Sequence, residues 1–489
     1  MTIPQSPTTV GNTAKTFKRR AVLIGIAAIA GNSVLSACGG ADTATNTAQP
    51  AASPSSTLAP APIVIGGQGN ATMPPAATSA STSVPTSAPT TGATSAAMTM
   101  PNIAGKSIAI EFYNVWGGDP AHPVNTLINT FNAKNTGVTV KGVTPNNDYL
   151  LVLQKAQAAT AAGSGPAIIA TPVAYALFAD ALLNIVNMDD IAGSEKDQVY
   201  ATILPASLKV SEQLGKTLGI PIAYATPVMY YNNDTFKAAG MDPKTFFTDW
   251  ETMERLGPML KAKAGGNPVA SYPGASVEWM AQALIQCAGG RVNGDDNRPT
   301  MDTPEAVYGM KKIADMATAG LWQNGKDAEV LAAFKAGSIP TAVLSISALG
   351  GLRTAANYDL GVTTFPPFAG KPRRMNAGGS FFGCYAKDKD QQKATWEFFK
   401  FAISEEGETI WNKTGYLNCT KYTVPLIPGQ EAAVTQLNEG LSVETQWPGA
   451  KGAQVLQVFR DYIVRIWTNN LTAADGLHQA KADIEKILA

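Results

Sequence analysis

From residue 107 onward, short segments with alternating apolar residues take turns with segments whose apolar residues recur every three to four positions. Ser107 to Phe112 and Val138 to Val143 alternate as half-buried strands do. Between them an amphipathic helix is predicted, because apolar residues recur at i, i+3, i+4 and i+7: Val124, Leu127, Ile128 and Phe131. Strands interleaved with helices predict an α/β fold with a largely parallel sheet and crossover helices.

The same alternation continues along the chain, with longer helices after residue 230. Tyr149 to Ala162 is predicted as a helix and Ala167 to Ala170 as a buried strand. Thr248 to Glu251 is predicted as a capping box whose helix is kinked or interrupted at Pro258. Two helices, 451–467 and 473–488, are expected to close the chain. About 380 residues exceed one typical core, so two lobes are expected.

The N-terminus has the pattern of an export signal. Lys18-Arg19-Arg20 precedes an apolar run from Ala21 to Gly31, which is too short to span a bilayer. Leu35-Ser36-Ala37-Cys38 resembles the bacterial lipobox, so 1–37 is predicted as a lipoprotein signal peptide and Cys38 as the lipidated residue. An uncleaved anchor helix is the alternative, and Arg19-Arg20 is compatible with twin-arginine as well as general export.

Residues 38–105 are predicted to form a disordered tether. After Cys38, this stretch contains a single charged residue, Asp42, and consists mainly of Ala, Thr, Ser and Pro. Such a composition buries too little apolar surface to offset the entropy lost on ordering. A folded part on this tether would stay near a membrane, at its extracytoplasmic face, while remaining free to find a partner.

Composition and motifs argue against several classes of function. Lys plus Arg and Asp plus Glu both number 37, and residues 1–37 hold four basic and no acidic residues, so the remainder is mildly acidic. This balance disfavours nucleic acid as a partner. No phosphate-cradling loop or metal-ligand spacing is present, so no cofactor or metal is expected. Two histidines, His122 and His478, lack a supporting catalytic motif. Cys287, Cys384 and Cys419 are expected to be buried, with one disulfide of unassigned pairing as the alternative.

The chain therefore favours binding without reaction. Sugars present hydroxyl edges and weakly apolar faces, which suit aromatic rings beside polar groups. Such groups gather in loops that follow strands. Trp116 follows the first predicted strand, Tyr149 opens a helix, Ser345 follows a strand and Trp447 lies in a Pro/Gly-containing loop. By contrast, helical apolar stripes place Trp250, Trp396 and Trp411 in the core.

One segment resembles a known family. Tyr224-Ala-Thr-Pro-Val-Met-Tyr-Tyr-Asn-Asn-Asp-Thr-Phe-Lys-Ala-Ala-Gly-Met-Asp-Pro243 is similar to the inter-lobe crossing of family 1 extracellular solute-binding proteins of ABC importers. Further matches include Asn376-Ala-Gly-Gly-Ser380 and Trp411-Asn-Lys-Thr-Gly-Tyr-Leu417, and the resemblance covers 106–489.

This resemblance implies a two-lobed periplasmic-binding-protein fold, type II-like, with hinge crossings and a ligand cleft between the lobes. The N-terminal lobe would comprise 106–227 plus 379–428, and the C-terminal lobe 228–378 plus 429–489. The expected partners are a sugar or polyol, the permease subunits of an ABC transporter, and a membrane through lipid on Cys38. The protein is expected to be a monomer and to have no enzymatic activity.

Within that family, glycerol-3-phosphate binders look nearest. The resemblance implies ligand contacts at Tyr149, Ser345, Gly378 or Gly379, and Tyr416. Trp116 and Trp447 from the predicted loops, together with Tyr224, Trp279 and both glycines, complete the predicted site. Three positions depart from that subgroup: no acidic residue stands near Pro172, one tryptophan of a pair is missing beside Trp279, and the phosphate-pairing arginine is absent at Leu456, with Arg460 a turn away. These departures favour a neutral sugar or polyol.

Three alternatives stay open. The first is a glycerol-3-phosphate or phosphodiester-type ligand in the same cleft. The second is an extracellular polysaccharide-degrading enzyme, which requires opposed carboxylates in the cleft. The third is a lipoprotein adhesin, which would show repeats or β-sandwich patterning, and neither is seen in the sequence.

Overall fold

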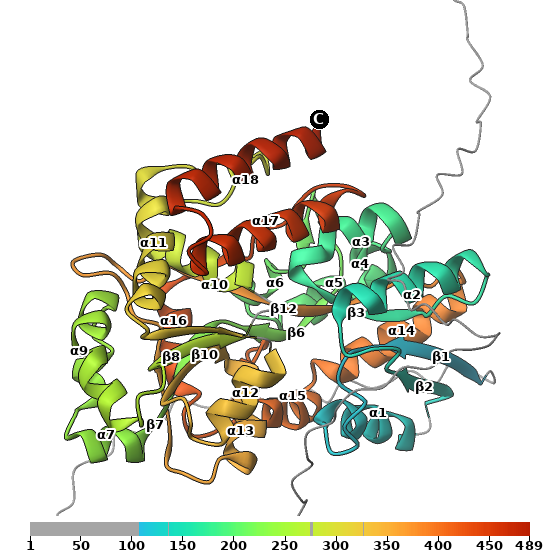
Figure 1. The fold of residues 1–489 in the computed structure, drawn as a ribbon. Coiled ribbons are helices and arrows are strands. Elements are labelled where there is room, and N and C mark those ends of the chain that lie inside the picture. The colour runs from blue at the N-terminus through green and yellow to red at the C-terminus, as the bar shows by residue number, and fades with distance from the viewer. Residues whose placement is uncertain (1–106, 135, 274–276, 326) are drawn as a thin grey trace, which may run out of the picture. The chain divides into compact units, whose positions relative to one another are not determined.

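The computed structural model describes residues 107–489 except 135, 274–276 and 326. The predicted signal peptide, Cys38 and the tether lie outside the described residues. The two larger sheets and their helices are shown in Figure 1. Among the described residues no helix is both long and apolar enough to cross a membrane.

The larger sheet has six strands and is mixed. Its order is β13-β12-β3-β1-β2, with β6 also paired to β12. β1 runs parallel to β2 and β3, but β12 is antiparallel to β3 and β6, so the expected largely parallel sheet is only partly present. The strands are β1 (Ile108–Tyr113), β2 (Val138–Val143), β3 (Ile168–Pro172), β6 (Ile220–Ala225), β12 (Met375–Cys384) and β13 (Leu441–Val443).

A second sheet has three strands. β7 (Pro227–Asn232) lies between β10 (Thr341–Ser345) and β11 (Leu360–Thr364), and both pair antiparallel with it. Two short pairs complete the strands: β4 (Glu212–Gln213) with β5 (Lys216–Thr217), and β8 (Ala270–Pro273) with β9 (Trp322–Gly325). Thr226 alone separates β6 from β7, so the chain passes from one sheet to the other within a single residue.

Helices cover both sheets. Contacts with the six-stranded sheet or with helices on it are made by α1 (Pro123–Ala133), α2 (Tyr149–Ala161), α3 (Ala176–Leu183), α4 (Met188–Ala192), α6 (Pro205–Leu208), α14 (Lys389–Ala402) and α15 (Glu405–Trp411). α10 (Val277–Cys287), α11 (Pro304–Thr318), α17 (Gly452–Trp467) and α18 (Ala473–Leu488) pack together. The remaining helices are α5 (Lys196–Tyr200), α7 (Asn233–Ala239), α8 (Pro243–Phe246), α9 (Trp250–Lys263), α12 (Asp327–Lys335), α13 (Leu349–Ala355) and α16 (Glu431–Glu439).

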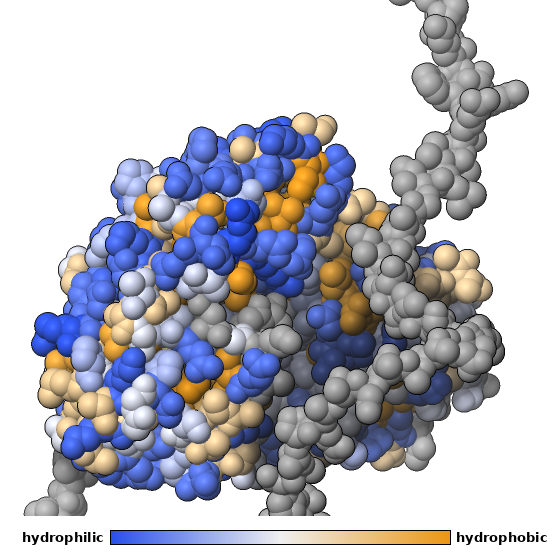
Figure 2. All heavy atoms as spheres, viewed as in Figure 1, coloured by the Kyte–Doolittle hydropathy of each residue, from blue (hydrophilic) through white to orange (hydrophobic). Residues whose placement is uncertain are grey.

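Aromatic side chains form much of the core beneath the larger sheet. The ring centroids of Phe112 and Phe382 are 4.7 Å apart, and those of Phe131 and Phe398 are 5.2 Å apart. These residues come from β1, β12, α1 and α14, so they tie the sheet to both helices. Polar side chains cover most of the face viewed in Figure 2, with small apolar patches between them.

Several local predictions are confirmed. The strand at Val138–Val143 and the helix at 473–488 have the expected bounds. Trp250, Trp396 and Trp411 are buried, and Cys287, Cys384 and Cys419 are buried free thiols.

The prediction for the helix after residue 248 was wrong about its N-cap and about an interruption at Pro258, whereas a kink there stays a prediction. Its N-cap is Asp249, whose carboxylate accepts from the Thr252 N–H at 2.7 Å, rather than Thr248. The helix also runs through Pro258 without interruption. Pro258 is exposed, so water can solvate the carbonyl that a proline leaves unpaired, while buried Trp250 and Leu260 hold the opposite face.

Candidate ligand-binding site

Four aromatic side chains meet where loops follow the strands of the larger sheet. Trp116 follows β1, Tyr149 opens α2, Trp411 ends α15 and Tyr416 lies in the segment after it. The Trp116 centroid is 6.3 Å from that of Tyr149 and 6.3 Å from that of Tyr416, and Trp411 stacks on Tyr416 at 5.7 Å. The predicted site residues Trp116, Tyr149 and Tyr416 are therefore neighbours.

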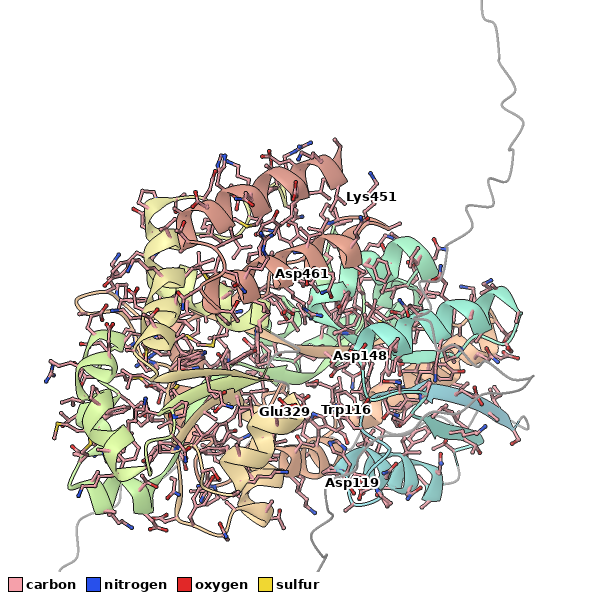
Figure 3. All side chains as sticks on the ribbon, in the orientation of Figure 1. Trp116, Asp119, Asp148, Glu329, Lys451 and Asp461 are labelled. Carbon is pink, nitrogen blue, oxygen red and sulfur yellow. The ribbon has the colours of Figure 1, made fainter. Side chains whose placement is uncertain are left out.

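Local hydrogen bonds hold the first two aromatic residues in place. Asn114, 1% exposed, accepts at Oδ1 from the backbone N–H of Trp116 and of Gly117, both at 2.9 Å. Asp148 caps α2 by accepting from Leu151 N–H at 2.9 Å, which fixes Tyr149 at the first helical position. Figure 3 shows Trp116 and Asp148 on these two loops.

Hydroxyl groups connect this aromatic group to the second sheet. Ser380 Oγ donates to the Tyr149 hydroxyl at 2.8 Å, and Tyr149 hydrogen-bonds to Tyr416. Tyr416 in turn hydrogen-bonds to Ser347, whose Oγ donates to Ser345 Oγ at 2.9 Å. Ser345 ends β10 of the three-stranded sheet, whereas Ser380 lies in β12 of the six-stranded sheet. We call these five side chains the hydroxyl chain.

The hydroxyls of this chain stay protonated at neutral pH. Burial raises the pKa of Tyr149 well above its usual value, the neighbouring Tyr416 raises it further, and the hydrogen bond from Ser380 lowers it. Burial likewise raises the pKa of Tyr416. Each phenol can therefore both donate and accept, which is the capacity needed to exchange hydrogen bonds with sugar hydroxyls.

A buried carboxyl and an indole lie against Gly378. A Cβ added to Gly378 would stand 2.6 Å from Glu444 Oε2 and 2.7 Å from Trp279 Nε1, so any side chain there would displace both groups. Trp279 is 7% exposed and Glu444 is 8% exposed. The Trp279 Nε1–H is buried and has no hydrogen-bond partner among the described residues.

Arg460 stands close by but is already paired. Its Nε donates to Glu278 Oε2 at 2.7 Å and its Nη2 donates to Glu278 Oε1 at 2.6 Å, a bidentate ion pair. Its Nη1 donates to the Tyr175 hydroxyl at 3.2 Å. Burial lowers the pKa of Arg460, but the hydrogen bonds and charge of Glu278 outweigh it and leave that pKa above its ordinary value.

Three of the predicted residues place no side chain in this group, although Gly379 lies between Gly378 and Ser380 in β12. Tyr224, 1% exposed, pairs through its backbone with Leu417, and its phenol lies near Cys419. Trp447, 1% exposed, packs on Phe459 at 6.4 Å. Gly379 has φ of +105°, and a Cβ there would overlap the Ala223 carbonyl oxygen on β6, which explains the need for glycine.

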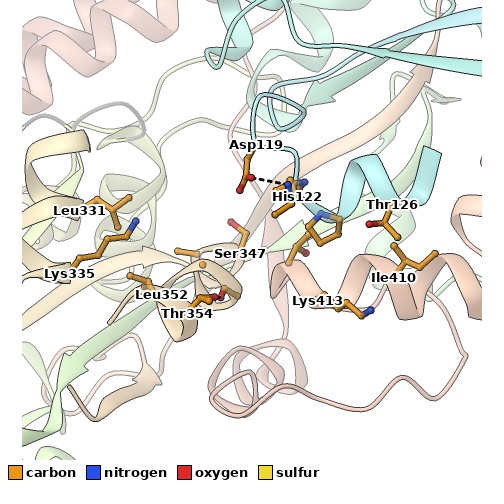
Figure 4. Close-up of a pocket in the computed structure, with 16 residues that line it drawn as sticks. Asp119, His122, Thr126, Leu331, Lys335, Ser347, Leu352, Thr354, Ile410 and Lys413 are labelled. Atoms are coloured by element: carbon orange, nitrogen blue, oxygen red, sulfur yellow. Dashed lines mark hydrogen bonds between the residues drawn. The ribbon is translucent and has the colours of Figure 1, made fainter. Parts of the chain in front are cut away.

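A groove opens beside the hydroxyl chain at Ser347. It has a volume of about 580 Å³ and lies between residues of α12 and α13 on one side and of α1 and α15 on the other. Figure 4 shows Lys335 and Lys413 at opposite sides of it, with Asp119 and His122 near its centre. Burial lowers the pKa of His122 to about 4, so its Nδ1 is free to cap α1 by accepting from Val124 N–H at 3.2 Å.

Sequence reasoning missed several residues of this group. Ser347 lies two residues after the predicted Ser345, and Ser380 ends the matched segment Asn376–Ser380, but Glu278 and Glu444 carried no recognisable signal. Glu278 is brought beside Arg460 from 182 positions away. Among the described residues, no group of three or more His, Cys, Asp and Glu side chains could hold a metal ion.

Comparisons with known proteins agree with this architecture. The model for the family described as bacterial extracellular solute-binding protein matches residues 126–470. The sn-glycerol-3-phosphate-binding periplasmic protein UgpB of Pectobacterium atrosepticum is 26% identical over 401 residues, covering 76% of this chain and 89% of the relative. UgpB of Escherichia coli K12 is 25% identical, with 76% and 90% covered.

Solved structures show the same fold. UgpB from Mycobacterium tuberculosis in complex with glycerophosphocholine superposes with a TM-score of 0.69 at 21% identity, covering 78% of this chain and 98% of that one. Maltose-bound MalE3 of T. maritima gives a TM-score of 0.65 at 17% identity, with 78% and 100% covered. The expected two-lobed α/β fold is thereby confirmed, and the chain belongs to the family of bacterial extracellular solute-binding proteins.

Proposed function

We propose that this protein is the extracytoplasmic substrate-binding lipoprotein of an ABC importer and that it captures a neutral sugar or polyol. The observation that carries the ligand class is the hydroxyl chain beside stacked aromatic rings, in a site whose arginine is already neutralised by Glu278. Such a site offers hydroxyl and aromatic contacts, and its arginine has Nε and Nη2 committed to Glu278 rather than open to a phosphate.

The mechanism is capture followed by closure and delivery to a permease. Ser345 and Ser347 come from the three-stranded side, and Tyr149, Ser380 and Tyr416 from the six-stranded side. A ligand that bonds to both sides stabilises the closed arrangement, because only that arrangement allows both sets of contacts. The lobes are proposed as 106–227 plus 379–428 and 228–378 plus 429–489, which places one boundary inside β12. No covalent step is proposed, and the working unit is a monomer.

Export and anchoring are part of the proposal. A signal peptide at 1–37 would direct export, and lipid on Cys38 would hold the protein at the outer face of the cell membrane. Cys38→Ala should move the protein from the membrane fraction to the soluble extracytoplasmic fraction. Membrane retention of the variant after export would exclude the lipid anchor.

A phosphate-bearing ligand is the second candidate, because the sequence relatives are named as sn-glycerol-3-phosphate-binding proteins. This reading requires Arg460 to leave Glu278 when ligand arrives. It predicts that Arg460→Met abolishes binding of sn-glycerol-3-phosphate.

Calorimetry with the purified full chain tests these readings. The neutral probes are maltose, D-tagatose and glycerol, and the phosphorylated probes are sn-glycerol-3-phosphate and glycerophosphocholine. We expect saturable binding of at least one neutral probe and no binding of sn-glycerol-3-phosphate. Binding of phosphorylated probes alone would replace the first reading with the second. Turnover of a polysaccharide that is lost in Glu278→Gln or Glu444→Gln would instead establish an enzyme.

A further inference from the structure

We propose that Glu444 is a ligand-contacting, specificity-determining residue that presents a neutral carboxylic acid and donates a hydrogen bond to an uncharged hydroxyl or carbonyl oxygen of the ligand. This inference rests on the proposed function, since it names how the same site recognises a neutral sugar or polyol. Acidic residues more often bind sugars as ionised carboxylates that accept hydrogen bonds. Glu444 differs because its carboxyl group carries a proton.

The backbone on both sides of Glu444 is fixed. Its own N–H donates to the Ala377 carbonyl at 2.8 Å, continuing the pairing of β13 with β12. Gln282 of α10 donates to the Val443 carbonyl at 3.2 Å and accepts from Thr445 N–H at 2.8 Å. These bonds direct the Glu444 side chain inward, against Gly378 and Trp279.

The carboxyl of Glu444 lacks a counter-charge. The side chain is 8% exposed, and no hydrogen bond or ion pair reaches its carboxyl group from the described residues. Arg460, whose charge acts on Glu444, uses Nε and Nη2 on both oxygens of Glu278. An isolated ionised carboxylate in such a place is costly, and the group avoids that cost by taking a proton.

The charged and titratable groups around Glu444 act in both directions. Burial raises its pKa well above the ordinary value, and the negative charge of Glu278 on α10 raises it further, whereas Arg460 on α17 lowers it. Tyr149 on α2 faces it as an uncharged phenol. On the outer side, Arg291 is paired with Asp295 at 2.5 Å. The balance favours the neutral acid.

Two donors then face the ligand without acceptors of their own. One is the Glu444 O–H and the other is the Trp279 N–H, and both lie against the position that a Cβ on Gly378 would take. Unsatisfied buried donors are expensive. A ligand that supplies an oxygen here gains hydrogen bonds without breaking any within the protein, which favours oxygen-rich neutral molecules and disfavours ammonium groups.

Two substitutions of nearly the same size separate the possibilities. Glutamine keeps an uncharged donor at this position, and leucine removes every polar atom. The full chain with Glu444→Gln or Glu444→Leu is titrated by calorimetry with the neutral probe, maltose, D-tagatose or glycerol, that wild type binds best. We expect Glu444→Gln to retain wild-type affinity within about threefold and Glu444→Leu to lose about tenfold or more.

Each other outcome overturns the inference. An equal loss of about tenfold or more in both variants would mean that the ionised carboxylate accepts from the ligand. Unchanged affinity in both would mean that Glu444 does not contact it. Glu408→Gln and Glu408→Leu are the matched controls, because Glu408 is another buried carboxyl, 1% exposed, beside Cys419 rather than the site. If Glu444→Leu does not fold, Glu444→Ala replaces it.

Failure of the proposed function has a separate signature. If the wild-type protein binds no neutral probe, both the proposed neutral ligand and the role of Glu444 are rejected. Titration of the wild-type protein alone is enough to show this. If wild type binds a neutral probe and both Glu444 variants bind it equally well, the function stands and only the role of Glu444 is rejected.

Discussion

Glu278→Gln should convert the site from one that ignores phosphate to one that binds it. In the wild type, Glu278 and Arg460 form a bidentate pair with side chains 7% and 19% exposed. Glutamine keeps the size of Glu278 but carries no charge and offers Arg460 a single acceptor oxygen. The change therefore leaves a largely buried guanidinium without a counter-charge, inside the proposed ligand site.

The magnitude follows from the geometry of this pair. Removing one partner of a buried ion pair costs about 3–5 kcal/mol. Arg460 keeps the Tyr175 hydroxyl at 3.2 Å and some exposure, so the loss should lie near the lower end, about 3 kcal/mol. For a folded part of this size, that corresponds to a fall in Tm of roughly 3–4 °C. A phosphate that pairs with the freed guanidinium should recover much of this loss.

Thermal unfolding and calorimetry with sn-glycerol-3-phosphate give the readouts. The variant should gain at least about tenfold in affinity over wild type, and the ligand should raise its Tm while leaving that of wild type unchanged. Glu397→Gln is the control, since it disturbs another buried ion pair, with Lys400 at 3.0 Å, outside the site. Strong wild-type binding that Glu278→Gln does not improve would refute the reasoning, because Glu278 would then release Arg460 to the ligand.

Three further changes test other parts of the structure. Tyr416→Phe removes the hydroxyl that meets Ser347 and Tyr149, and calorimetry should show neutral-ligand binding weakened by about 1 kcal/mol. Gly379→Ala should cost about 3 kcal/mol or more of unfolding free energy in urea, because φ is +105° and the new Cβ meets a carbonyl oxygen, whereas Gly351→Ala, with open space around it, should be tolerated. Burial raises the pKa of Glu408 from 4.5 to about 8, so the folded state holds a proton that the unfolded state has lost between those values. The Glu408 contribution to wild-type stability should therefore fall as pH rises from about 4.5 to 8, a loss of about 3 kcal/mol by pH 7. Glu408→Gln should remove this contribution from the pH dependence measured in urea titrations and leave the one due to Glu444.

The spacing of apolar residues predicted local structure well, because within one helix or strand this spacing reflects which face is buried. Val138–Val143 alternates buried and exposed residues over its first four positions and has the expected strand bounds. The helix after Asp249 shows where this reasoning fails. Pro258 removes one backbone hydrogen bond from the helix. Whether the helix ends there depends on the tertiary packing of its buried face, which the local sequence does not show.

The aromatic half of the site was also predictable in position. Trp116, Tyr149 and Ser345 each follow or begin an element at the end of a strand, and topology brings such loops together. Tyr224 and Trp447 had equally suitable side chains, yet both are 1% exposed and packed elsewhere. Residue type alone therefore did not separate a ring of the candidate site from a ring packed in the core.

The charged half of the site depended on contacts that sequence spacing does not encode. Arg460 had the right chemistry for a phosphate, but in the structure its Nε and Nη2 both donate to Glu278. Glu444 gains its character in the same way, since a carboxyl beside an unpaired arginine would be an ionised partner, but beside a committed one it is a buried acid. The charge on Glu444 therefore depends on the pairing of Arg460, which donates to Glu278 and not to Glu444. Exchanging that single partner is the change that should redirect the protein from neutral to phosphorylated ligands.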